Sequence, residues 1–191
     1  MSFSSAQVEQ LLKPIAPQRV LKDGKGHAHL SQQDVVAHLV RCFGFGGFDT
    51  DVLSLDLVFE EARTKDTDNG PVMTGRWDVC YRALVRLTVR DPEGNVVCHY
   101  ENGSTATAQN QTRGDAHDLA MKAAVSLSIK RAAVPLGDQF GSSLYNKGQL
   151  SALVKGTLVR PDPEAVPADV QDGVEQQVSL GNDEIDREGD E

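Results

Sequence analysis

Apolar residues return at helical spacing near the start of the chain. A short amphipathic stretch is interrupted by two prolines and followed by a polar, glycine-containing link at residues 22–26. Ser31 then offers an N-cap for a helix that runs through Cys42, with valine, leucine and phenylalanine at helical spacing. Gly44 stands where a helix-ending glycine is expected. This part of the chain therefore predicts one well-defined helix after an irregular start.

The middle of the chain alternates apolar and polar residues with the period of two that β-strands have. Strands are predicted at residues 52–63, at residues 76–90 and from Val96 towards Ala108, and Asp91–Asn95 is a turn signal between the last two. Each strand should present one apolar face and one polar face. The predicted apolar face of the first strand carries Leu53, Leu55, Leu57 and Phe59, and the polar face of the second carries Arg76, Arg82, Arg86 and Arg90.

A second helix is predicted from Ala116 to about Ala133, with Asp115 as its N-cap and Pro135 beyond its end. Its apolar residues fall on two sides, which indicates a helix covered both by the sheet and by another subunit or segment. The order helix, three strands, helix predicts an α+β fold with a β-β-β-α core and a preceding helix. The two predicted stripes are Met121, Val125, Ile129 and Ala132, and Ala116, Leu119, Ala123 and Leu127.

Charge divides the 191 residues unevenly. The net charge is −9, yet residues 161–191 hold eleven acidic residues and one basic residue, which is −10 and leaves +1 for the preceding 160. The acidic segment has no aromatic residue and the composition of a disordered tail. We therefore predict a domain at residues 1–150 and a linker with a disordered acidic tail at 151–191. The chain has no secretory signal and no long apolar run, so the expected location is intracellular, in the cytoplasm or nucleoid, with no membrane partner.

Basic residues near the end of the second predicted helix are candidates for a phosphate-binding surface. Lys130 and Arg131 end the helix, Lys122 lies two turns earlier, and Arg113 precedes it. Lysine and arginine release counterions from a nucleic-acid backbone without reading bases. The alternative is that cations near a helix C-terminus simply complement the helix dipole.

The arginine row of the second strand is a separate candidate for nucleic-acid contact. Four arginines, Arg76, Arg82, Arg86 and Arg90, recur on one strand face, which is more than solvation requires. Acidic neighbours such as Asp56 and Glu60 offer the alternative of a salt-bridged surface. The sequence leaves both interpretations open.

No pattern of catalytic or metal-binding residues is present in the sequence. The three cysteines are widely spaced without a CxxC pair, which favours buried thiols over a disulfide framework or a zinc site. The Gly44–Phe48 segment lacks the spacing and the lysine of a phosphate loop, and a structural turn is the preferred interpretation. We therefore expect neither an enzyme nor a cofactor or metal ion.

Several segments, in this order and spacing, resemble the Rad52/22 family of single-strand annealing proteins. The similarity covers about residues 15–150 and leaves out the acidic tail. The segments are Pro17-Gln18-Arg19-Val20, Cys42 to Phe48, Val79 to Leu87 with the turn at Asp91 to Gly94, Ala120 to Ala124, Lys130-Arg131-Ala132, Phe140-Gly141 and Leu144-Tyr145.

The resemblance implies a ring or open helical filament with a basic groove that holds single-stranded DNA and anneals it without nucleotide. By position, Lys130 and Arg131 resemble the basic pair of the inner groove. Arg90 resembles a basic position of a second, outer DNA site, and Phe45 stands where the family often has a tyrosine. The chain departs from the family at Asp34, where arginine is common, and at Val134, where another basic residue often follows. This predicts a less basic groove, with Arg113 or Arg82 as possible compensation.

The function that these observations indicate is ATP-independent binding of single-stranded DNA and annealing of complementary strands in recombination and double-strand break repair. A nuclease or a single-strand binding protein is a further candidate partner. One alternative is a DNA end-protecting protein that does not anneal. Another is a small α+β enzyme, against which the missing catalytic constellation counts.

Overall fold

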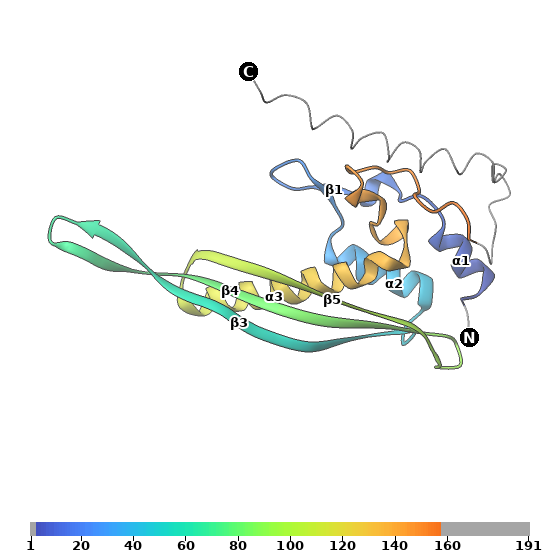
Figure 1. The fold of residues 1–191 in the computed structure, drawn as a ribbon, viewed down its shortest axis with the longest axis horizontal. Helices are drawn as coiled ribbons and strands as arrows, with labels where there is room; N and C mark the ends of the chain where they lie inside the picture. Colours follow the sequence, from blue (N-terminus) through green and yellow to red (C-terminus); the bar gives the residue numbers. More distant parts are fainter. Residues whose placement is uncertain (1–2, 158–191) are drawn as a thin grey trace, which may run out of the picture. The chain divides into compact units, whose positions relative to one another are not determined.

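The computed structural model of the chain describes residues 3–157. Residues 3–155 group into one compact unit, whose centre is a three-stranded antiparallel sheet in the order β3-β4-β5. A long helix, α3, lies along one face of this sheet (Figure 1). The predicted α+β class and the β-β-β-α core are confirmed. The elements of the core are β3 (Phe48–Thr67), β4 (Gly70–Arg90), β5 (Val96–Gln111) and α3 (Arg113–Ala133).

Shorter elements precede and follow this core. The link predicted at residues 22–26 is the turn of a small hairpin, in which Leu21 pairs with His29. The acidic segment 161–191 lies outside the described residues, and the domain boundary at residue 150 stays a prediction. The shorter elements are α1 (Ser5–Leu11), η1 (Pro17–Arg19), β1 (Leu21–Lys22), β2 (Ala28–His29), α2 (Gln32–Phe43), η2 (Val134–Leu136), η3 (Asp138–Phe140) and η4 (Ser143–Tyr145).

Both ends of α2 lie where the sequence predicts them. The hydroxyl of Ser31 accepts a hydrogen bond from the backbone N–H of Asp34 at 3.1 Å, which satisfies one of the free donors of the first turn. Gly44 ends the helix with φ of 82°, a left-handed value that costs glycine nothing. The helix therefore begins and ends through local interactions.

The strands are longer than predicted, and two of them continue past the third. The last pair between β4 and β5 joins Trp77 to Gln111. Beyond it, β3 and β4 form a two-stranded ribbon as far as the turn between Thr67 and Gly70. In Figure 1 this ribbon projects beyond α3. The strands predicted at residues 52–63 and 76–90 stop short of this ribbon, because the alternation of apolar and polar residues does not continue into it.

Irregularities in β3 change which side chains share a face. The register shifts between Val52 and Ser54 and again between Leu57 and Phe59. Residues directly opposite in an antiparallel pair share a face. Leu57 pairs with Tyr81 on the face that α3 covers, whereas Phe59 pairs with Cys80 on the other face. The prediction that Phe59 shares the face of Leu57 is wrong, because an extra residue in one strand reverses the alternation.

The helix α3 begins three residues earlier than predicted, and its N-cap is Thr112 instead of Asp115. The Thr112 hydroxyl accepts from the backbone N–H of Asp115 and donates to the Asp115 carboxylate at 2.7 Å. Asp115 lies in the first turn, where a negative charge favours the helix dipole. The predicted end of the helix is confirmed, since α3 ends at Ala133 before the turn that contains Pro135.

Small residues spaced by four form the buried stripe of α3, which neither predicted stripe describes. Leu119, which was expected to be covered, is 48% exposed. Ser128 is fully buried and its hydroxyl donates to the carbonyl of Ala83 on β4 at 3.0 Å. Small side chains let the helix approach the sheet closely enough for this contact. The buried stripe is Ala116, Ala120, Ala124, Ser128 and Ala132, with Ile129 and Ala133 beside it.

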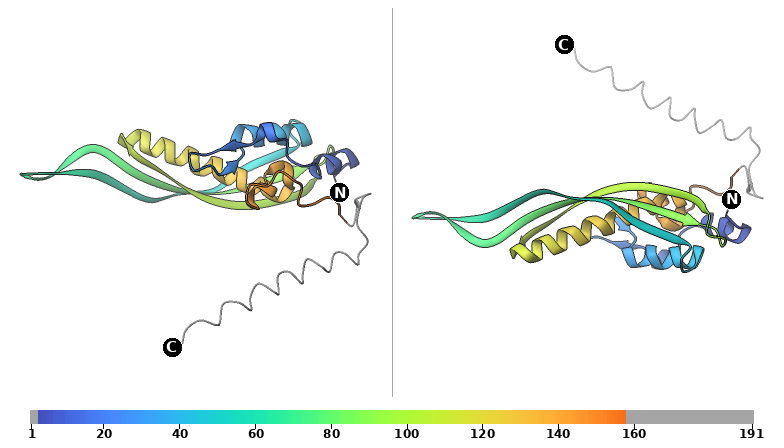
Figure 2. Two further views of the ribbon diagram at one scale, coloured as in Figure 1. Left: turned by 90° about the horizontal axis from the view of Figure 1, so that it is seen from above. Right: turned by 90° about the horizontal axis from the view of Figure 1, so that it is seen from below.

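The main core lies where α2 and the end of α3 pack against one end of β4. Val35 and Leu39 of α2 meet Leu87 and Val89 of β4 and Phe140 of η3 there. Figure 2 shows α2 and α3 on the same side of the sheet. Among the described residues no helix covers the other side, which we call the open face.

Candidate nucleic-acid interface

A hollow with a volume of about 370 Å³ opens beside the end of α3, and we call it groove 1. It is bordered by β2, the start of α2, the end of α3 and the segment through η4. Its lining combines an apolar floor with cationic side chains and, as far as the structure describes the chain, contains no aspartate or glutamate. The lining residues are Ala28, His29, Leu30, Val35, Ser104, Leu127, Lys130, Arg131, Val134, Phe140, Gly141, Leu144 and Tyr145.

Lys130 is half-buried in the wall of groove 1. Its ammonium group donates a hydrogen bond to the carbonyl of Leu30 at 3.2 Å, across a separation of one hundred residues in the chain. Burial among apolar side chains lowers the pKa of Lys130 below its ordinary value. The ammonium group has three donors, so two stay available for a ligand in the groove.

Arg131 is exposed and lines two hollows at once. The second hollow, groove 2, has a volume of about 530 Å³ and also contains Arg82, Gly103 and Thr105. Among the residues that the structure describes, the Arg131 guanidinium has no hydrogen bond or ion pair. The adjacent Lys130 and Arg131 therefore share groove 1, and the fold adds Arg82 from the central strand to the second hollow. No acidic side chain from the described part of the chain lines groove 2 either.

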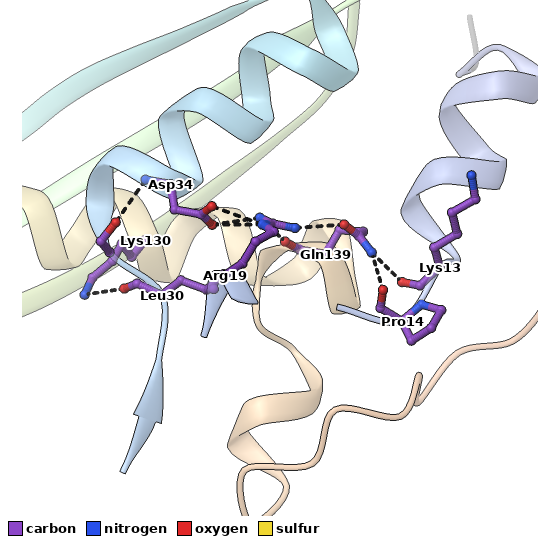
Figure 3. A network of polar contacts seen from close by, with 8 residues as sticks. Lys13, Pro14, Arg19, Leu30, Asp34, Lys130 and Gln139 are labelled. Carbon is purple, nitrogen blue, oxygen red and sulfur yellow. Dashed lines mark hydrogen bonds and ion pairs between the residues drawn. The ribbon is translucent and has the colours of Figure 1, made fainter. Parts of the chain in front are cut away.

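A polar network holds the start of α2 beside this site (Figure 3). Arg19 binds Asp34 through two guanidinium nitrogens, with the shortest contact at 2.8 Å. Arg19 also donates to the side chain of Gln139 at 2.8 Å and to its carbonyl at 2.9 Å. Gln139 in turn donates to the carbonyls of Lys13 and Pro14. Asp34, the acidic departure from the family pattern, is thus an ion-paired structural residue, and it does not line either groove.

Three members of the arginine row, Arg82, Arg86 and Arg90, lie on the open face with an acidic partner each, whereas Arg76 has no ion pair among the described residues. Arg82 binds Asp56 of β3 at 3.1 Å. Arg86 binds Glu101 of β5, and Arg90 binds Asp49 of β3 at 2.8 Å. These contacts match the alternative of a salt-bridged surface and leave less net positive charge for DNA. Arg82 is the member that also lines a groove.

Arg113 and Lys122 do not join the basic pair. Arg113 begins α3, and at 1.5 Å per residue it lies about 26 Å along the helix from Lys130. Its guanidinium binds Glu60 at 2.6 Å and lies 4.9 Å from the centre of the Trp77 ring. The hydrogen bond from Arg113 lowers the pKa of Glu60.

Lys122 is engaged within α3 itself. Its ammonium group binds Asp118, one turn earlier in the same helix, at 2.7 Å. Both side chains are exposed, so the pair contributes little to stability. Lys122 lines neither groove 1 nor groove 2. Its proposed part in DNA contact stays a prediction.

Phe45 is 95% exposed and lines neither groove, although its neighbours Phe43 and Phe48 pack against the core. The loop that carries it is tied to the end of β4, because the backbone N–H of Arg90 donates to the carbonyl of Gly47 at 2.9 Å. Phe45 is therefore part of the same end of the sheet as Arg90. The preferred interpretation of this loop as a structural turn fits Phe43 and Phe48, but not Phe45.

Sequence reasoning missed three contributors to groove 1: His29, the carbonyl of Leu30 and Tyr145. No role for His29 follows from the sequence, and Tyr145 carries part of the resemblance without an assigned role. A signal for Tyr145 was present, because it follows the basic helix end by fourteen residues in a segment rich in glycine and aromatic residues. Local sequence contains no comparable signal for a backbone carbonyl a hundred residues away.

Three further findings concern metal ligands, thiols and membrane-spanning helices. Residues 3–157 contain no group of three histidine, cysteine or carboxylate side chains that could hold a metal ion. Cys42, Cys80 and Cys98 are all free thiols, and burial raises the pKa of Cys42 and Cys98. Within the same residues, every helix is too short or too polar to cross a membrane.

Comparison with known proteins identifies the family to which this chain belongs. The model of the Rad52/22 family of double-strand break repair proteins matches residues 4–160. The chain therefore belongs to the Rad52/22 family. One curated relative, the DNA repair and recombination protein RAD52 of Eremothecium gossypii, is 30% identical over 121 residues. The match covers 63% of this chain and 24% of the relative, so this chain matches about a quarter of the relative's length.

Proposed function

We propose that the protein binds single-stranded DNA along grooves 1 and 2 and anneals complementary strands in recombination and double-strand break repair. The observation that carries this proposal is the exposed guanidinium of Arg131, which has no hydrogen bond or ion pair within residues 3–157. It lies between two hollows that contain cations and, among the described residues, no acidic side chain. A cation without a protein partner can neutralise a phosphate without first breaking an ion pair. Because the chain belongs to a family of double-strand break repair proteins, DNA is the polyanion that we expect these cations to bind.

In this mechanism the protein supplies geometry and charge. Lys130 and Arg131 hold consecutive phosphates, and Arg82 extends the contact towards the open face once it releases Asp56. Contacts to phosphate fix the path of the strand without reading its sequence. Most bases are left facing outward, where a complementary strand can pair with them. No covalent bond is made or broken in this mechanism, so it uses neither nucleotide hydrolysis nor a catalytic metal ion.

Self-assembly is the second part of the proposal, and two features of the sheet support it. Both β3 and β5 are edge strands, whose outer backbone groups lack a strand partner within the described residues. In addition, β3 exposes an apolar row in which Val52, Leu55 and Leu57 are 51%, 39% and 48% exposed. Such a row marks an interaction surface. A contact between unlike edges of successive copies closes into a ring or extends as a filament.

Annealing of two complementary fluorescent oligonucleotides in EDTA, without nucleotide, tests the activity. The expected result is pairing faster than the spontaneous reaction, with a particle mass of many copies in mass photometry. Tight binding without acceleration would instead favour a protein that protects DNA ends. Dependence on ATP or a divalent cation would refute the mechanism. A monomeric mass both with and without DNA would refute the assembly.

A further inference from the structure

Tyr145 is an aromatic side chain left exposed on a fixed backbone beside the basic pair. It is 70% exposed, although it lines groove 1. The preceding Ser143 and Leu144 are buried, and the backbone N–H of Gly148 donates to the carbonyl of Leu144 at 2.9 Å. Within the described residues the Tyr145 hydroxyl makes no hydrogen bond. The ring therefore projects from a well-anchored short helix and stacks on no other aromatic ring of the described residues.

The chemistry of groove 1 suits a flat, weakly polar group attached to an anion. Its floor is apolar, and its cations lie at one side on the end of α3. Leu30, Leu127 and Phe140 belong to that floor. The volume of about 370 Å³ lies in the range of about 300–1,000 Å³ found for small-molecule sites. A nucleobase on a phosphodiester backbone has both properties.

We infer that groove 1 takes one nucleobase of the bound strand per protomer, which stacks against Tyr145 while Lys130 and Arg131 hold the flanking phosphates. This inference rests on the proposed function and adds a base contact to it. Aromatic side chains beside a cationic groove bind single strands through stacking, which every base permits. The docked base anchors the strand at intervals, and the bases between anchors stay outward for pairing.

Stacking and phosphate contact predict different responses to salt, which separates the two parts of the site. Stacking releases no counterions, so loss of Tyr145 should weaken binding equally at all salt concentrations. Loss of a phosphate contact lowers the slope of log affinity against log salt by about 0.7 for single strands. Tyr145→Ala and Arg131→Ala should therefore both weaken binding, but only the second should change the slope.

The experiment measures binding of the full-length protein to a labelled oligonucleotide and to one of equal length with abasic sites. Tyr145→Ala should weaken binding to the intact strand about five-fold or more, from a stacking contribution of about 1–3 kcal/mol per base. Tyr145→Phe, which keeps the ring, should stay within two-fold of the wild type. On the abasic strand, Tyr145→Ala and the wild type should bind equally. Thermal unfolding of each variant checks that this exposed position leaves the fold intact.

The inference is overturned if Tyr145→Ala binds the intact strand like the wild type, or loses affinity equally on both strands. An equal loss would indicate that Tyr145 contacts the sugar-phosphate backbone of the strand and not a base. A groove that serves an acidic peptide instead would likewise give no base-dependent difference. Failure of the proposed function would appear differently, as an unchanged affinity and salt slope in Arg131→Ala.

Discussion

Replacing both Lys130 and Arg131 with alanine tests the central assignment of the DNA site. Arg131 is unpaired among the described residues, and Lys130 uses one of its three donors on the Leu30 carbonyl. Each is thus free to neutralise a phosphate. Two lost phosphate contacts should lower the salt slope by about 1.4 for a single strand. Between 50 and 200 mM salt, the wild type should then lose about seven-fold more affinity than the double variant.

The measurement is fluorescence anisotropy of a labelled oligonucleotide at several salt concentrations. Because Lys130 is half-buried, a second variant, Lys130→Met with Arg131→Ala, keeps its aliphatic stem packed and separates lost charge from lost packing. Lys122→Ala is the matched control on the same helix, since Lys122 is already paired with Asp118 and lines neither groove. It should leave the slope unchanged.

A wild-type slope in the double variant would refute the placement of the strand in groove 1. So would a change of equal size in Lys122→Ala, because that result would indicate a general effect of net charge. Methionine and alanine variants that differ strongly from each other would indicate that packing of Lys130 contributes to the measured loss.

Three further predictions concern stability and the acidic segment. Gly47→Ala should lower the free energy of unfolding by about 2 kcal/mol or more in chemical denaturation, because a Cβ there would overlap the backbone carbonyl of Phe43; an unchanged midpoint would refute this. Burial lowers the pKa of His38 to about 4 from an ordinary value of 6.5, so the unfolded chain gains its proton first and stability should fall as the pH drops from about 6.5 to 4. The loss should total roughly 3 kcal/mol, and His38→Leu should remove it; equal pH dependence in both proteins would assign it to other groups. Deletion of residues 161–191, with net charge −10, should raise DNA affinity more at low salt than at high salt, whereas equal affinities at low salt would favour a merely solubilising tail.

Local sequence determined the ends of helices and the positions of turns, because these depend on contacts within a few residues. Ser31 and Gly44 mark the two ends of α2 as predicted, through a side-chain cap and a left-handed glycine. The turn between β4 and β5 forms where it was expected, with the Asp91 carboxylate accepting from the backbone N–H of Asn95. Alternation also located the strands, and the basic pair at the end of α3 was visible in the sequence.

Tertiary structure decided which side chains the strands and the long helix bury. The register shift before Phe59 depends on how β3 pairs with β4, so no period in β3 alone predicts it. In α3 the apolar residues are spread over two sides. The periodicity of the sequence predicted that larger ones, such as Leu119, would be buried. The residues buried against β4 are alanines and Ser128 instead, because their small size permits the short contact to Ala83.

The site itself divides in the same way. Sequence identified Lys130 and Arg131 as candidate cations, since their charge is a property of the residue type. Which cations stay free depends on partners from other strands: Asp56, Glu101 and Asp49 pair with three arginines of β4, and Arg131 has no such neighbour in the described chain. Groove 1 likewise joins residues from β2, α2, β5, α3 and η4. Long-range packing brings those segments together, and only the folded chain could therefore place a cation pair, an apolar floor and an exposed tyrosine in one groove.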